Sequence, residues 1–109
     1  MFRMLSCFNL KAGVSMDKFH GLLAAYTALL QALDLVDSTA PSGSRQANTI
    51  MDTDDERGHQ YFVTLSFRDR ALCDRTVDCI RGHQQPGDGI HRQVYARVVD
   101  QVFICREDL

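Results

Sequence analysis

The first third of the chain contains MFRMLSCFNL (residues 1–10) and SMDKFHGLLAAYTALLQALD (residues 15–34), two segments whose apolar residues repeat with different periods. In the first segment apolar side chains occupy alternate positions, the period of a β-strand. In the second they recur at steps of three and four, the period of one buried helix face. The members of this stripe are Phe19, Leu22, Leu23, Tyr26, Leu29, Leu30 and Leu33. The sequence therefore predicts a strand and then an amphipathic helix, with Ser15 as the helix N-cap.

The same succession of patterns recurs downstream. Residues 61–67 and residues 98–106 read as strands, and residues 71–81 between them have the helical period. Asp69 is expected to cap this second helix and Gly82 to end it. The chain therefore predicts two strand–helix–strand units, with the middle strands adjacent in sequence.

The connecting segments are less regular. Residues 35–39 could begin a further strand, residues 41–43 (PSG) interrupt it, and residues 45–51 could resume it. The acidic run 52–58 reads as a polar hairpin connection. For residues 90–96 a short helix and an early start of the last strand both remain open. The predicted order is β-α-β-β-α-β over residues 1–109, taken as one domain.

Both faces of the predicted sheet carry apolar residues. On the face opposite the helices, the strand alternation places Leu5, Cys7, Phe62, Val99 and Phe103 beside Asn9, Thr64, Ser66 and Gln101. Four strands give this face an apolar-to-mixed area on the order of 400 Å². Monomers seldom leave such a patch uncovered. The expected partner is a second copy of the chain, packed sheet to sheet as an isologous homodimer.

This element order, with its apolar second sheet face, resembles the dimeric α+β barrel superfamily. The superfamily includes antibiotic-biosynthesis-type monooxygenases, muconolactone isomerases and stress-responsive barrel proteins. The resemblance implies an α+β, ferredoxin-like βαββαβ fold, in which two helices cover one face of an antiparallel four-stranded sheet. It also implies a pocket for a small apolar or aromatic molecule between sheet and helices, and no cofactor. A cofactor-independent monooxygenase or isomerase and a purely structural or stress-associated dimer are the alternatives.

Five residues are candidates for a site. Asn9, His20 and His91 are candidate catalytic residues, because an amide can orient a substrate and a histidine can exchange protons near neutral pH. Tyr61 and Tyr95 are candidate ligand-binding residues. Whether the protein is an enzyme stays open.

His91 and Tyr95 are four residues apart, so on a helix they would share a face. With Arg92 or Arg97 nearby, this pair could bind a carboxylate or a phenol. For the other candidates the residues suggest alternatives: a surface position for His20, a helix-capping role for His83, and a turn residue that hydrogen-bonds its own backbone for Asn9.

Four other site types match the sequence poorly. A haem-degrading site of the superfamily would use Asn9 and His83 with a tryptophan, and the chain has no tryptophan. The acidic run 52–56 lacks the glycine and glutamate positions of a calcium loop. Residues 57–64 match an RNA-recognition signature only at Arg-Gly and one aromatic position. No histidine or cysteine spacing is typical of a metal site.

Composition sets the broad class. The chain has 109 residues, 45% of them hydrophobic, and a net charge of −2. This charge predicts no attraction to nucleic acid or to an anionic membrane. No segment has the roughly 20 apolar residues that cross a bilayer. A soluble cytoplasmic protein with four reduced cysteines is the expectation.

Overall fold

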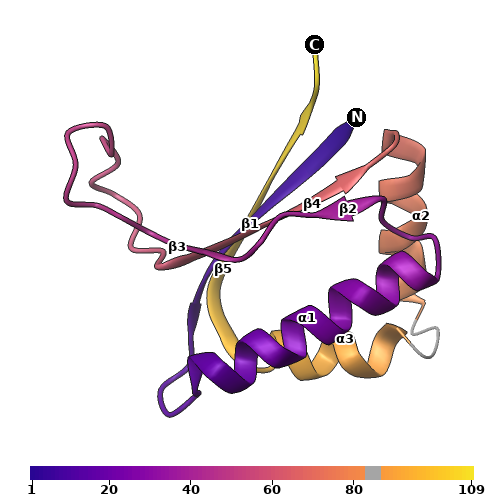
Figure 1. Cartoon of the computed structure of the whole chain (residues 1–109), viewed down its shortest axis with the longest axis horizontal. Helices are drawn as coiled ribbons and strands as arrows, with labels where there is room; N and C mark the ends of the chain where they lie inside the picture. The colour runs from indigo at the N-terminus through magenta and orange to yellow at the C-terminus, as the bar shows by residue number, and fades with distance from the viewer. Residues whose placement is uncertain (83–86) are drawn as a thin grey trace.

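The computed structural model describes residues 1–82 and 87–109, and its helices lie on one side of a twisted sheet (Figure 1). The strands are β1 (Phe2–Leu10), β2 (Ser38–Thr39), β3 (Gly43–Ser44), β4 (Tyr61–Phe67) and β5 (Val98–Glu107). The helices are α1 (Met16–Ala32), α2 (Arg70–Arg81) and α3 (Gly87–Tyr95). The predicted order of elements is confirmed, with one helix more than expected.

The sheet has the ferredoxin-like arrangement. Its strand order is β2-β4-β1-β5, with β3 also paired to β4, and every pair is antiparallel. The first and last strands of the chain, β1 and β5, therefore lie side by side. On the other side of β1, β4 pairs with the short strands β2 and β3, which precede it in the sequence. The α+β, ferredoxin-like fold expected from the sequence is confirmed.

The second strand of the motif is split into β2 and β3, as the PSG segment suggested. The expectation that it resumes over residues 45–51 is wrong. The Arg45 amide makes the last bond of this ladder, donating to the Gln60 carbonyl at 2.7 Å. Beyond it the chain leaves the sheet, because the Arg45 side chain binds the Asp52 carboxylate instead.

Local sequence explains where the helices begin. The Ser15 hydroxyl accepts a hydrogen bond from the Lys18 amide at 3.5 Å, and the Asp69 carboxylate accepts one from the Leu72 amide at 2.8 Å. Both predicted N-caps are confirmed. Of the two structures expected for residues 90–96, the helix is the one observed, as part of α3. Three helices, not two, therefore cover the sheet.

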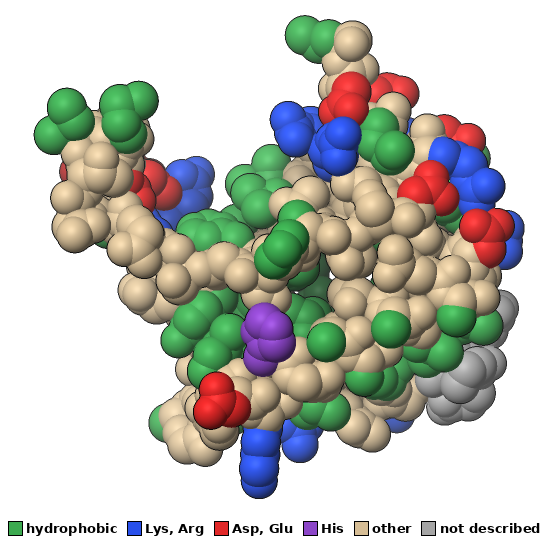
Figure 2. Space-filling view, in the orientation of Figure 1, with side chains coloured by type: hydrophobic (Ala, Val, Ile, Leu, Met, Phe, Trp, Pro, Cys, Tyr) green, Lys and Arg blue, Asp and Glu red, His purple; other side chains and the backbone are tan. Residues whose placement is uncertain are grey.

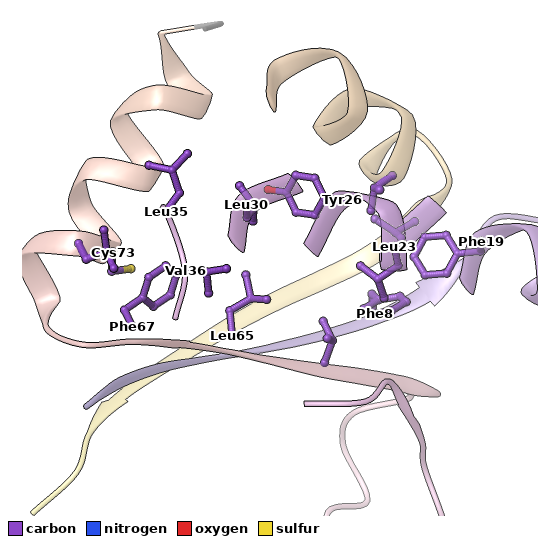
Figure 3. Packing of buried hydrophobic residues seen from close by; sticks show 14 residues of the cluster. Phe8, Phe19, Leu23, Tyr26, Leu30, Leu35, Val36, Leu65, Phe67 and Cys73 are labelled. Carbon is purple, nitrogen blue, oxygen red and sulfur yellow. The ribbon is translucent and has the colours of Figure 1, made fainter. Parts of the chain in front are cut away.

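The core lies between the sheet and these helices (Figure 3). The buried side chains come from alternate positions of β1 and β4 and from the predicted stripe of α1. Its largest members are Phe8, Phe19, Tyr26, Leu30, Leu65 and Phe67. Leu33, predicted as part of the stripe, is 37% exposed because α1 ends one residue before it.

A β-bulge reverses the expected alternation of β5. Cys7 pairs with Val102 and Asn9 with Val99, so two residues of β5 oppose Phe8 alone. Asp100 in the bulge has a left-handed φ of 57°, which aspartate tolerates better than most residues.

The consequence is a correction to the outer face, meaning the sheet face away from the helices. Val99 lies on it as predicted, but Phe103 pairs with Ser6 and lies on the helix side. Val102 and Ile104 take its place, at 36% and 50% exposure. The outer face is therefore still apolar, but its apolar residues differ from the predicted set. They are Leu5, Cys7, Phe62, Val99, Val102 and Ile104.

Candidate functional site

A cavity of about 410 Å³ lies between the sheet and the three helices. Its apolar lining comes from β1, β4, α2 and β5: Met4, Leu65, Phe67, Val77, Ile80 and Phe103. Its polar lining comes from all three helices: Tyr26, Cys73, Thr76, Arg81, His91 and Tyr95. A hollow of this size, mainly apolar with a few polar groups, has the form of a small-molecule site.

Four rings form a continuous row along one side of the cavity. The His91 ring lies between two tyrosines, with its centroid 5.7 Å from that of Tyr26 and 4.6 Å from that of Tyr95. Phe103 continues the row, 6.0 Å from Tyr95. The row exists because α1 and α3 pack side by side and the β5 bulge turns Phe103 inward (Figure 1). It gives a flat aromatic ligand a surface on which to stack.

Burial keeps the tyrosine hydroxyls of the cavity protonated. Tyr26 is 5% exposed, and burial together with the neighbouring Tyr95 raises its pKa far above the ordinary value of 10.0. Burial also raises the pKa of Tyr95, against a smaller opposing effect of a hydrogen bond with Ser6. At neutral pH both phenols are therefore neutral groups able to donate a hydrogen bond.

Two other polar residues of the lining have restricted chemistry. The Thr76 hydroxyl hydrogen-bonds to the Leu72 carbonyl at 2.9 Å and to the Leu35 carbonyl, so its proton is already used within the protein. Burial raises the pKa of the Cys73 thiol, which keeps it out of the nucleophilic thiolate form. Arg81, at the end of α2, is exposed and adds a positive charge at the rim.

The raised pKa of Tyr26 predicts a loss of stability in alkali. Below pH 10 both folded and unfolded chains keep the phenol proton, and above it the unfolded chain releases the proton while the folded chain retains it. The unfolding free energy should therefore fall as pH rises above 10, by up to about 1.4 kcal/mol per pH unit from this residue. Urea unfolding at pH 9 and pH 11 should show a shallower decline for Tyr26→Phe than for the wild type. Equal declines would contradict the assignment.

The structure brings together only two of the five predicted site residues. His91 and Tyr95 both line the cavity, as their spacing suggested, whereas His20 is exposed on α1. Tyr61 is on the helix side of the sheet but outside the cavity, with its ring centroid 6.0 Å from that of Phe8. This position also removes it from the open sheet face on which an RNA-stacking residue would have to lie.

Asn9 binds protein groups on the outer side of the sheet. Its amide nitrogen donates to the Asp100 carboxylate at 3.3 Å, and its amide oxygen accepts from the Gln60 backbone at 2.9 Å. His59, which is 8% exposed, contacts the Asp100 carbonyl at 2.7 Å. Asn9 thus ties the β5 bulge to the start of β4. His83, the other residue of the haem-degrading alternative, lies outside the described residues.

Sequence reasoning missed Tyr26, Arg81 and Phe103 as cavity residues. Tyr26 was assigned to the core stripe of α1, and its hydroxyl was the only signal that one member of the stripe differed. Arg81 is an exposed arginine at the last position of α2, which reads in the sequence as an ordinary surface residue. Phe103 required the bulge, which the strand alternation does not reveal.

Residues 1–82 and 87–109 are the part of the chain that the structure describes. Across these ranges no three histidine, cysteine or acidic side chains gather in a way that could hold a metal ion. In the same ranges no helix has the length and apolarity needed to span a membrane. The four cysteines are free thiols; Cys7 lies on the outer face, and Cys105, which pairs with Met4, on the helix side.

No protein-family model matches the chain, and no curated protein matches it either. Solved structures do. A protein of Arabidopsis thaliana, At3g17210, is 11% identical with a TM-score of 0.78 over 100% of this chain and 96% of its own. A hydroxynitrile lyase from Passiflora edulis is 13% identical with a TM-score of 0.67, over 96% and 90% of the two chains. A dimeric ferredoxin-like protein of unknown function from Jannaschia sp. CCS1 is 14% identical with a TM-score of 0.69, over 98% of both.

These similarities extend over nearly the whole of every chain compared, at identities that leave few residues in common. The similarities therefore show that the backbones follow the same path, and they say nothing about which side chains line the cavity. The protein has the ferredoxin-like fold of these structures.

Proposed function

We propose that the protein binds a small aromatic molecule carrying one oxygen group, in the cavity between sheet and helices. The observation that carries this proposal is the cavity itself, about 410 Å³ with a row of rings along one side. An interior without such a hollow would have favoured a purely structural protein. The apolar lining supplies most of the binding free energy, and the rings favour a flat ligand.

The polar groups of the cavity select the ligand's oxygen. Tyr26 and Tyr95 are neutral donors, so they suit a phenol, a carbonyl or a carboxylate oxygen. Arg81 at the rim favours an anionic form. Two ligands with the same ring system, one a phenol and one a carboxylate, can therefore be compared. The difference in their affinities separates the contribution of the tyrosine hydroxyls from that of the Arg81 charge.

Calorimetric titration with 2-naphthol and with 2-naphthoate tests the proposal. The wild type should bind at least one of the two, and Val77→Trp should abolish binding by filling the cavity from α2. Tyr95→Phe should weaken binding about five- to tenfold through loss of one hydrogen bond. Tyr61→Phe is the matched control, since Tyr61 lies outside this cavity, and should bind like the wild type. Failure of both probes to bind at millimolar concentration, or binding that survives Val77→Trp, would contradict the proposal.

A proton-transfer enzyme is the second candidate, and the position of the His91 ring in contact with two tyrosine rings favours it. An imidazole in ring contact with two neutral phenols can accept a proton from a bound substrate or return one. One protein of the same fold is a hydroxynitrile lyase. Release of benzaldehyde from mandelonitrile that is lost in His91→Ala would support an enzyme of this kind. No release above the uncatalysed rate would leave ligand binding as the function.

We also propose that the outer face pairs with a second copy of the chain. The face exposes Val102 and Ile104 beside the partly buried Leu5 and Phe62, in a row across β5, β1 and β4. Apolar residues so grouped favour burial against another sheet. The description of a protein of the same fold as dimeric supports this arrangement.

A further inference from the structure

Residues 45–60, here called the arm, project from the body of the protein between β3 and β4 (Figure 1). The radius of gyration of the chain is 14.3 Å, whereas a compact domain of this length has about 13 Å. At the end of the arm Ile50 is 93% exposed and Met51 is 83% exposed. Hydrophobic side chains at the tip of the projection are visible in the space-filling view (Figure 2). Two large apolar side chains are therefore displayed away from the core.

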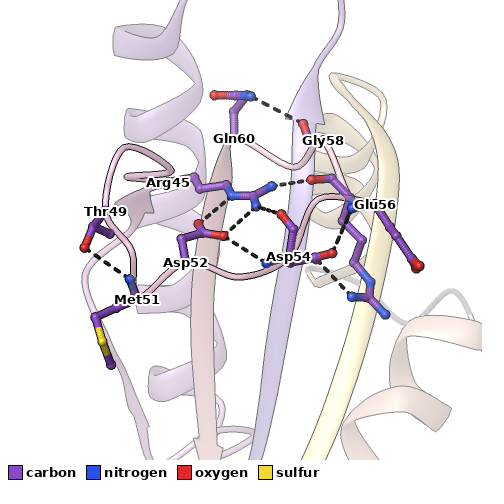
Figure 4. A network of polar contacts seen from close by, with 9 residues as sticks. Arg45, Thr49, Met51, Asp52, Asp54, Glu56, Gly58 and Gln60 are labelled. Atoms are coloured by element: carbon purple, nitrogen blue, oxygen red, sulfur yellow. Dashed lines mark hydrogen bonds and ion pairs between the residues drawn. The ribbon is translucent and has the colours of Figure 1, made fainter.

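The arm has a defined shape, because one partly buried guanidinium closes it (Figure 4). Arg45 donates two hydrogen bonds to the Asp52 carboxylate, at 2.9 and 2.8 Å, and others to the carbonyls of Asp54 (2.6 Å) and Arg57. The Asp54 carboxylate in turn binds the Arg57 side chain at 2.9 Å. The Arg45 side chain is only 12% exposed, and it holds the pKa of Asp52 below its ordinary value. The exposed tip is thus presented on a hydrogen-bonded support.

The arm rises beside the outer face. A hollow of about 250 Å³ at its base has Arg45 and Arg57 among its charged lining and Leu5, Phe62 and Ile104 as its apolar lining. The base of the arm and the outer face therefore border the same space. A body resting on the outer face would meet the arm as well.

The tip matches the outer face in chemistry. Residues 46–51 (QANTIM) carry no charge. The charged residues of the arm flank them, and Arg45 pairs with Asp52 and Arg57 with Asp54 at its base. The outer face likewise exposes apolar side chains, Val102 and Ile104, and the charged groups beside Ile104 are these same two pairs. Two surfaces on one chain that expose apolar side chains suit a second copy of that chain, because in an isologous pair each contact occurs twice.

We infer that the arm is a clamp for a second copy of this chain, with Ile50 and Met51 buried against the partner subunit. This inference rests on the proposed homodimer and adds to it a second, separate contact. The open sheet faces supply the centre of the interface, and the two arms close over its ends.

Sedimentation equilibrium of the double variant I50S/M51S tests the clamp. Both side chains are exposed in a single subunit, so the stability of the subunit should not change. The dissociation constant of the dimer should rise at least about a hundredfold, since four apolar side chains per dimer lose their burial. The matched control is A24S/A28S, which removes apolar surface from exposed positions of α1 and should leave the dissociation constant unchanged.

The outcomes separate the clamp from the dimer. A wild-type dimer whose dissociation constant changes less than twofold in I50S/M51S would overturn the clamp and leave the dimer standing. A monomeric wild type would overturn both.

A photo-crosslinking residue, benzoylphenylalanine, in place of Met51 locates the contact. The clamp predicts crosslinks to a second chain, identified by mixing isotopically light and heavy subunits. Crosslinks confined to the same chain would overturn the clamp, because the tip would then fold onto its own subunit.

Discussion

In the proposed homodimer, Ile104→Asp should separate the two chains into monomers at micromolar concentration. Ile104 is 50% exposed on the outer face, on the edge strand β5, where it pairs with Leu5 of β1. In an isologous dimer the substitution places two carboxylates in one apolar interface. Burying unpaired charges of equal sign is strongly unfavourable, so we expect the dissociation constant to rise at least about a thousandfold. Sedimentation equilibrium measures this directly.

Gln93→Asp is the control for Ile104→Asp. It adds the same charge at an exposed position of α3, on the side of the molecule away from the outer face. This variant should dimerise like the wild type. If Ile104→Asp also dimerises like the wild type, the outer face is not the interface.

Phe19→Ala should cost the protein about 3–5 kcal/mol of unfolding free energy. Phe19 is 1% exposed, and its ring centroid lies 5.3 Å from that of Phe8 on β1. The substitution leaves a hollow where α1 meets the sheet, and the surrounding side chains can close it only in part. Because small domains have a total stability of about 5–15 kcal/mol, much of the margin would be lost.

Urea unfolding at one fixed protein concentration measures the effect of Phe19→Ala, since the proposed dimerisation would make stability depend on concentration. The adjacent His20 is exposed, so His20→Ala should stay within about 0.5 kcal/mol of the wild type. A loss below 1 kcal/mol in Phe19→Ala would show that α1 does not pack on β1 as described.

The sequence predicted the parts of the fold that depend on local periodicity. The stripe of α1 and the caps Ser15 and Asp69 follow from contacts within a few residues, which the sequence displays directly. The alternation in β1 and β4 was also readable, because both strands run without interruption. His91 and Tyr95 were brought together correctly for the same reason, as a pair on one helix face.

The errors arose where distant residues decide the local conformation. Asp100 adopts a left-handed φ within a bulge, and from there on every side chain of β5 points to the side opposite the one predicted. Arg45 leaves the sheet because it binds Asp52 and the backbone beyond it. Neither event has a local signal, since an aspartate within a strand and an arginine after one are ordinary residues.

The candidate site was predictable only in part for a related reason. Tyr26 is a regular member of an apolar stripe, and only the packing of α1 against α3 brings its ring to His91. The cavity itself is a property of three helices and a sheet, so no single segment specifies it. Its presence had been expected from the resemblance, and its lining came from the structure.

A crystal structure of the protein grown with 2-naphthol tests the central claim most directly, because it shows where the ring lies. We predict density for the naphthalene rings between sheet and helices, stacked along His91 and Tyr95, with the hydroxyl within hydrogen-bond distance of Tyr26 or Tyr95. A cavity that stays empty both at saturating 2-naphthol and in a matching crystal with saturating 2-naphthoate, or that is closed by its own side chains, would contradict the account.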